Sequence, residues 1–278
     1  MTSRERRDDR RVVFERDEYA CRNCGAIGGD DEPTTVRTYP VGDVSLEGTA
    51  HESSLVTVCE RCFTALQESD ALSNLSVDRD ELFRLVRETT RTQGATISDV
   101  ASFASLVTSL PTALAETEPG DESRDYAAEY VETRRDVLLA IDVVDTRLDR
   151  LGAVETTDLG PEVATPLETV TETATTLQSD LREVVELGET VVTGLDRCHG
   201  CFEPLEGAAA SESGSGTRAC GTCALEPRST DDWRRSAGDG VAFERLFSTI
   251  NDRLRGTSTT TEALTDRTMA LAETLLEE

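Results

Sequence analysis

The sequence predicts a mainly α-helical protein that carries two small zinc modules, and three observations support this fold class. The eight cysteines form four C-x-x-C pairs, and a pair at this spacing can present both sulfurs to one metal ion. Long segments repeat apolar residues at intervals of three and four, as helices do. Aromatic residues are only 4% of the chain, so its cores must consist mainly of Val, Leu and Ala.

The first zinc module is predicted over residues 1–68. Its expected zinc ligands are Cys21, Cys24, Cys59 and Cys62. Gly25 suits the left-handed backbone that closes a sharp turn after the first pair. The second pair ends the apolar run 55–58 and begins a helix, whose unpaired amides favour thiolates. A structural zinc is favoured over a redox dithiol because no βαβ pattern surrounds either pair.

Two helices are predicted over residues 69–118. Leu82, Leu85 and Val86 mark the apolar stripe of the first helix. Ser98 is the expected N-cap of the second, and Pro111 is expected to kink or restart it.

Residues 119–197 have coiled-coil spacing and predict an antiparallel helical hairpin. The apolar positions are Val137, Ile141, Val144, Leu148 and Leu151, then Leu167, Val170, Ala174, Leu177, Leu181 and Val184. The break between them, residues 152–166, is rich in Gly, Pro and Thr. Two segments that dimerise in trans are the alternative to a hairpin within one chain.

A second zinc module, of the ribbon type, is predicted over residues 198–228. Its expected ligands are Cys198, Cys201, Cys220 and Cys223. Gly200 and Gly221 fall inside the two turns, where we expect tight backbone geometry. His199 is an alternative ligand, and residues 206–218 are expected to form a flexible loop. Helices are predicted again over 239–278, with a Gly-Thr-Ser interruption at 256–258.

The charge of the chain is strongly acidic, with a formal net charge of −27. All 28 basic residues are arginine, and this composition resembles that of cytosolic proteins from salt-accumulating halophiles. No run approaches 18 apolar residues and the N-terminus is charged, so we expect a cytoplasmic protein without a membrane partner. In a reducing compartment, paired cysteines are metal ligands more often than disulfides.

The segment Arg11-Val-Val-Phe-Glu-Arg-Asp-Glu-Tyr-Ala-Cys21-Arg-Asn-Cys24-Gly resembles the entry to the cysteine-containing HNH endonucleases. The resemblance continues through Thr35-Val-Arg-Thr-Tyr-Pro40 and Leu55-Val-Thr-Val-Cys59-Glu-Arg-Cys62 and covers residues 8–68. It implies a ββα-metal fold in which the four cysteines hold a structural zinc and separate residues hold a catalytic cation.

The positions that the family uses for catalysis carry other residue types here. Val36 and Arg37 stand where the resemblance implies a metal ligand and a general base, with Thr38 as the alternative if the strand slips by one. Ser54 stands at the Asn position, and Phe63 at the closing His. A guanidinium cannot accept a proton near neutral pH, and Val and Phe cannot bind a cation. We therefore expect no catalytic residue, although a shifted alignment offers His51 as a base.

Three functions are consistent with these patterns. The first is an inactive HNH-like zinc protein that binds nucleic acid or protein, with Arg11, Arg16 and Arg37 as candidate DNA contacts. The second is an active endonuclease, which would also need a catalytic Mg²⁺ or Mn²⁺. The third is an adaptor that self-associates through the coiled coil, with two structural zinc ions as end caps.

Overall fold

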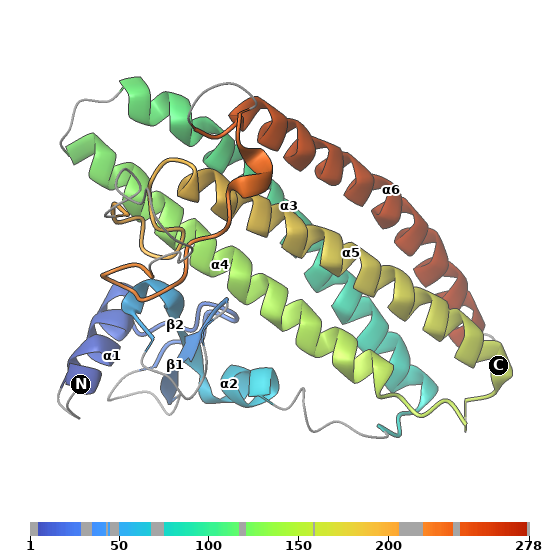
Figure 1. Cartoon of the computed structure of the whole chain (residues 1–278). Coiled ribbons are helices and arrows are strands. Elements are labelled where there is room, and N and C mark those ends of the chain that lie inside the picture. The colour runs from blue at the N-terminus through green and yellow to red at the C-terminus, as the bar shows by residue number, and fades with distance from the viewer. Residues whose placement is uncertain are drawn as a thin grey trace.

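Four long helices lie side by side, and a small cysteine-rich module packs against one of them (Figure 1). The computed structural model describes residues 5–28, 35–42, 44, 50–67, 75–116, 121–157, 159–205, 219–235 and 240–276. Within these ranges the chain forms six α-helices and one two-stranded antiparallel sheet. The predicted loop 206–218 lies outside the described residues.

The N-terminal module combines two short strands with two helices. Its elements are α1 (Glu5–Arg16), β1 (Val36–Pro40), the 3-10 turn η1 (Glu52–Ser54), β2 (Leu55–Cys59) and α2 (Glu60–Gln67). β1 pairs with β2 so that Val36 faces Cys59 and Pro40 faces Leu55. Pro40 ends its strand, where a missing N–H costs the ladder little. Every residue of β2 is buried, since α1, α2 and α4 all pack on this strand.

The long helices are α3 (Arg79–Glu116), α4 (Asp121–Gly152), α5 (Pro161–Thr193) and α6 (Phe243–Leu276). The colours of Figure 1 show that α3 and α5 run in one direction and α4 and α6 in the other. α5 contacts each of the other three helices, and α3 also contacts both α4 and α6. The main core of the protein therefore lies around α5.

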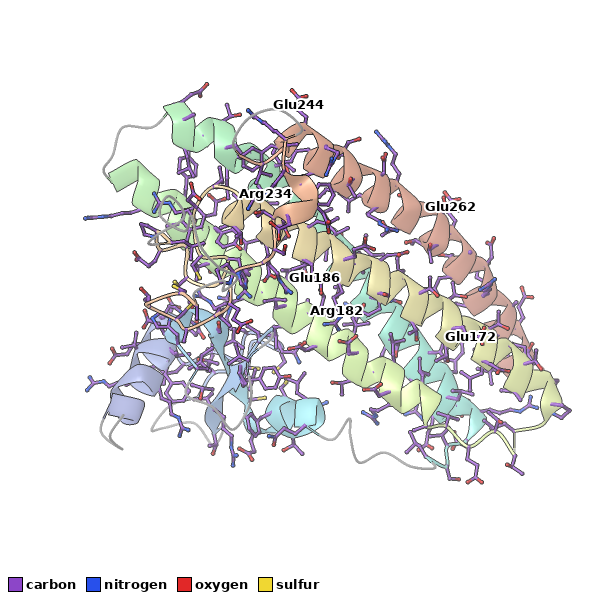
Figure 2. All side chains as sticks on the ribbon, in the orientation of Figure 1. Glu172, Arg182, Glu186, Arg234, Glu244 and Glu262 are labelled. Carbon is purple, nitrogen blue, oxygen red and sulfur yellow. The ribbon has the colours of Figure 1, made fainter. Side chains whose placement is uncertain are left out.

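The apolar stripes predicted from the heptad spacing face this core. All eleven heptad positions are buried, including Ile141, Leu177 and Leu181, which are fully buried. Two buried glutamines link the helices, because Gln93 Nε2 donates to the carbonyl of Ala174 at 2.7 Å and Gln178 Nε2 to that of Ile141 at 2.9 Å. Charged side chains such as Glu172, Glu186 and Glu262 cover the outer faces of α5 and α6 (Figure 2).

Four details of the helix prediction are wrong. Residues 79–116 form one helix, so Ser98 is an interior residue and caps nothing. Pro111 lies inside this helix near its end and does not restart it, because its ring removes only one N–H and the fully buried Leu110 keeps the last turns packed. α6 likewise runs unbroken through 256–258, and α5 begins at Pro161, so the connection after α4 is shorter than predicted.

The predicted hairpin is not a free-standing stalk. α4 and α5 do contact each other, but α3 packs on both and α6 covers α5. By length and composition, α3 is the one helix in the described ranges that is long and apolar enough to cross a membrane. Its residues Leu82, Val86, Phe103 and Leu110 are nevertheless buried inside the protein.

Candidate metal centres

The first four cysteines converge between the N-terminal turn, the end of β2 and the start of α2. The sulfurs of Cys21, Cys24, Cys59 and Cys62 all lie within 4.8 Å of one another. The Cys24 and Cys59 Sγ atoms are 3.7 Å apart. Tetrahedral zinc with Zn–S bonds of about 2.3 Å requires a sulfur separation of about 3.8 Å, whereas a disulfide requires about 2.05 Å. The geometry fits a four-thiolate metal site and excludes a disulfide.

The second group of four cysteines follows α5 directly and has the same geometry. Its sulfurs also lie within 4.8 Å of one another, with Cys198 Sγ 3.4 Å from Cys223 Sγ and Cys201 Sγ 3.6 Å from Cys220 Sγ. Cys198 is fully buried, and only Cys201 and Cys223 are partly exposed. A closed shell of four thiolates leaves no open coordination position, which is typical of a structural site.

The turn around Cys21 has a defined hydrogen-bond pattern, and we call a turn with this pattern a knuckle. The Cys21 amide donates to the carbonyl of Ala26, five residues later, at 2.8 Å. The Gly25 amide donates back to the Cys21 carbonyl at 2.8 Å, with Gly25 at a φ of +73°. The left-handed residue turns the chain back so that both cysteines of the pair face the same point.

The second centre is built from two further knuckles with the same pattern. The Cys198 amide donates a hydrogen bond to the carbonyl of Glu203 at 2.8 Å, and the Cys220 amide donates to that of Leu225 at 2.9 Å, again five residues later. The left-handed positions are Phe202 and Ala224, at φ values of +63° and +62°. These residues have a Cβ, so each adopts this conformation at a cost of about 1–2 kcal/mol that glycine would avoid.

The expectation that Gly200 and Gly221 supply the tight turns is therefore wrong. Neither glycine has a positive φ, because the left-handed residue is the one after each second cysteine. Gly200 fits for a different reason: a Cβ at this position would lie 2.3 Å from Leu225 Cδ1, so the end of the Leu225 side chain would have to rotate away. Gly200 lets the two knuckles approach closely. A Cβ on Gly221 would meet no atom within 4 Å.

Polar groups around the sulfurs favour thiolates. Asn23 Nδ2 donates to Cys62 Sγ at 3.3 Å, and the Gly200 amide donates to Cys198 Sγ at 3.4 Å. Without metal, the Cys62 thiol and nearby backbone amides lower the pKa of Cys21 to about 4, against the effect of burial. The same contact raises the pKa of Cys62. A metal ion must therefore displace protons from the remaining thiols, which makes its binding pH-dependent.

The positions that would be catalytic in an HNH endonuclease are filled by packing contacts. The Arg37 guanidinium lies 4.9 Å above the ring of Phe63 and forms an ion pair with Glu60. The Ser54 side chain is buried, with the residue only 1% exposed. His51 caps η1, where its Nδ1 accepts a hydrogen bond from the Ser53 amide at 3.2 Å. His51 therefore has a structural role in the loop where the shifted alignment would place a base.

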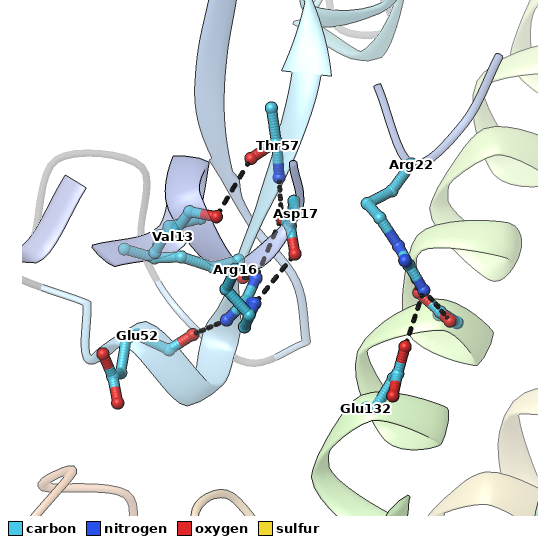
Figure 3. Close-up of polar contacts among 9 residues, drawn as sticks. Val13, Arg16, Asp17, Arg22, Glu52, Thr57 and Glu132 are labelled. Carbon is cyan, nitrogen blue, oxygen red and sulfur yellow. Dashed lines mark hydrogen bonds and ion pairs between the residues drawn. The ribbon is translucent and has the colours of Figure 1, made fainter. Parts of the chain in front are cut away.

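Arg16 and Arg11 differ in how they are held. Arg16 donates to both carboxylate oxygens of Asp17, at 2.8 and 3.0 Å, and to the carbonyls of Glu52 and Leu55 (Figure 3). These contacts tie α1 to η1 and β2. Arg11 lies on the exposed face of α1 and pairs with Glu15 at 2.7 Å.

A buried ion network, which no sequence pattern had predicted, joins the second metal centre to the helices. Glu189 accepts from Arg134 Nε and from Arg228 Nε, both at 2.7 Å. The Glu189 and Arg134 side chains are only 1% and 2% exposed. A signal was available, since Arg134 continues the stripe of Val137 and Ile141 toward the N-terminus, and a buried charge needs a partner.

Comparisons of the chain with protein-family models, with curated proteins and with solved structures found no match. The two four-cysteine centres and the helices that hold them are therefore the observations from which a function has to be inferred.

Proposed function

We propose that this protein is a zinc-stabilised scaffold with an HNH-endonuclease-like N-terminal module, and that it acts by binding a partner without cleaving nucleic acid. The observation that carries the proposal is the pairing of Arg37 with Phe63 and Glu60. Neither a guanidinium nor a phenyl ring can bind a divalent cation or activate water.

The order of elements in the module supports the HNH-like part of this proposal. A cysteine knuckle is followed by two antiparallel strands and then by a helix that begins beside Cys59 and Cys62. This order of a two-stranded sheet and a helix supports the ββα arrangement that the sequence resemblance implies. Zinc is the ion proposed for both centres, because four thiolates at this spacing suit its tetrahedral geometry.

A protein is the partner class that we favour. All three candidate DNA contacts already have partners inside the module, because Arg11 pairs with Glu15, Arg16 with Asp17 and two carbonyls, and Arg37 with Glu60. The net charge of −27 also opposes approach to a phosphate backbone. DNA binding through Arg11, Arg16 and Arg37 remains the second candidate. Self-association through α4 and α5 is less supported, since α3 and α6 cover these helices within one chain.

Elemental analysis and a nicking assay test the proposal together. We expect two zinc ions per purified chain and no cleavage of supercoiled DNA with Mg²⁺ or Mn²⁺, at low or molar salt. Metal-dependent cleavage that disappears in the His51→Ala variant would support the endonuclease alternative. A chain that binds no zinc would overturn the proposal. Fluorescence anisotropy with labelled duplex DNA then separates the two partner classes.

A further inference from the structure

The buried ion network lies where three parts of the chain meet. Glu189 is near the end of α5, Arg134 is on α4, and Arg228 follows the last cysteine of the second centre. The second pair of contacts is as short as the first, with Arg134 Nη2 and Arg228 Nη2 each 2.6 Å from a Glu189 oxygen. Each carboxylate oxygen of Glu189 therefore accepts hydrogen bonds from one arginine, and both arginines are needed to pair both oxygens.

The same stretch of α4 also holds the second metal centre through aromatic contacts. The fully buried Tyr130 donates its hydroxyl to the carbonyl of His199, between two zinc ligands, at 2.8 Å. Its ring lies 5.1 Å from that of Phe202, the left-handed residue of the first of the two knuckles. α4 thus contacts the second centre in two places. Tyr130 contacts its first knuckle, and the Arg134–Glu189–Arg228 network holds the segment that follows its second knuckle.

The first module docks on the same residues of α4. Arg22, between its first two cysteines, donates to Asp136 and Glu132, the latter at 3.3 Å (Figure 3). Gly42, after β1, packs so closely on α4 that a Cβ there would lie 3.3 Å from Arg134 Nη2 and 3.2 Å from Leu138 Cδ1. Residues 130–138 of α4 therefore contact both cysteine-rich modules, and Arg134 is shared between them.

We propose that the two metal centres are thermodynamically coupled through residues 130–138 of α4, so that metal at the second centre stabilises the docked first module. The inference rests on the proposed zinc binding. When the second centre loses its ion, its thiolates no longer hold the two knuckles together, and Arg228 is less firmly held against Glu189. Arg134 is then the remaining counter-charge of the buried Glu189 carboxylate, and its guanidinium shifts toward it. Because Gly42 of the first module packs against this guanidinium, the shift loosens the docked module. By linkage, metal at the first centre stabilises the second by the same factor.

Hydrogen exchange on the full-length, zinc-loaded chain tests the coupling. The readout is the exchange rate of amides in β1, β2 and α2 of the first module. Cys220→Ser/Cys223→Ser removes the second centre, whereas Arg228→Met removes the contact with Glu189 and leaves all eight cysteines. The matched control is Arg234→Met, because Arg234 follows the same centre but pairs with Asp231 in solvent, where its side chain is 70% exposed.

We expect first-module exchange to accelerate about tenfold in the double cysteine variant, as is common for coupled sites, with one zinc still bound. Arg228→Met should accelerate it by a smaller factor with two zincs bound, and Arg234→Met should leave it unchanged. Unchanged exchange in Arg228→Met, or in the double variant with one zinc, would overturn the coupling alone. A wild-type chain without zinc would instead overturn the proposed function on which the coupling rests.

Discussion

Replacing Glu189 by glutamine tests whether the buried network stabilises the fold. The new side chain would have nearly the same shape but no charge, so the change isolates the electrostatic part of the contact. Arg228 is 29% exposed and can turn toward water, but Arg134 is 2% exposed and would stay buried without a counter-charge. Removing one partner of a buried pair costs about 3–5 kcal/mol. Because only one of the two arginines stays trapped, we expect a cost of about 3 kcal/mol, at the lower end of this range.

Urea unfolding of the zinc-loaded protein, followed by circular dichroism, measures this cost. At a slope of about 3 kcal/mol per molar urea, the midpoint should fall by about 1 M. The control is Glu183→Gln on the same helix, where the Glu183–Arg253 pair at 2.8 Å is nearly half exposed and should contribute less than about 1 kcal/mol. Equal midpoints for the two variants would refute the conclusion that the Glu189 charge is needed.

Three more predictions concern pH and the knuckles. Burial opposes ionisation of Glu189, but Arg134 and its neighbours lower the pKa of this carboxyl. The difference in free energy of unfolding between wild type and Glu189→Gln should therefore be constant above the ordinary glutamate pKa of about 4.3. It should disappear as the pH falls through the lowered pKa of Glu189 in the folded protein. Ala224→Gly should raise the melting temperature, because glycine adopts the left-handed backbone without strain and the free energy of unfolding rises by about 1 kcal/mol. The control Gly221→Ala should change it little, since its Cβ would meet no atom within 4 Å. A lower melting temperature for Ala224→Gly would contradict the knuckle geometry. Gly200→Ala should lower the melting temperature only slightly, because the new Cβ meets the end of the Leu225 side chain, which can rotate away. A decrease as large as that for a buried core substitution would contradict this.

The sequence predicted those features that depend on local spacing. Two cysteines separated by two residues can share one ion in almost any surrounding structure, so both four-cysteine groups were found. Residues such as Ile141 and Leu177 lie on a helical stripe whose burial follows from periodicity alone.

Features that depend on distant contacts were missed. Ser98 and Pro111 carry the local signals of a helix start and a helix stop, but packing on α4 and α5 keeps α3 continuous across both. Tertiary contacts commonly override such propensities. Glu189 and Arg228 have no local signal of their contact, because no local pattern shows that residues 39 positions apart form an ion pair. The sequence around Arg16 likewise does not indicate that its guanidinium donates to the distant carbonyls of Glu52 and Leu55.

The Arg134–Glu189–Arg228 network has a consequence for how this chain can diverge. Losing one member leaves a buried charge, whereas replacing all three by apolar residues of similar size is often neutral or even stabilising. Single substitutions at these positions should therefore be rare among descendants of this sequence, and joint replacement should be tolerated. Positions 134, 189 and 228 are expected to co-vary, and a future alignment would reveal this contact between α4, α5 and the second metal centre without any structure.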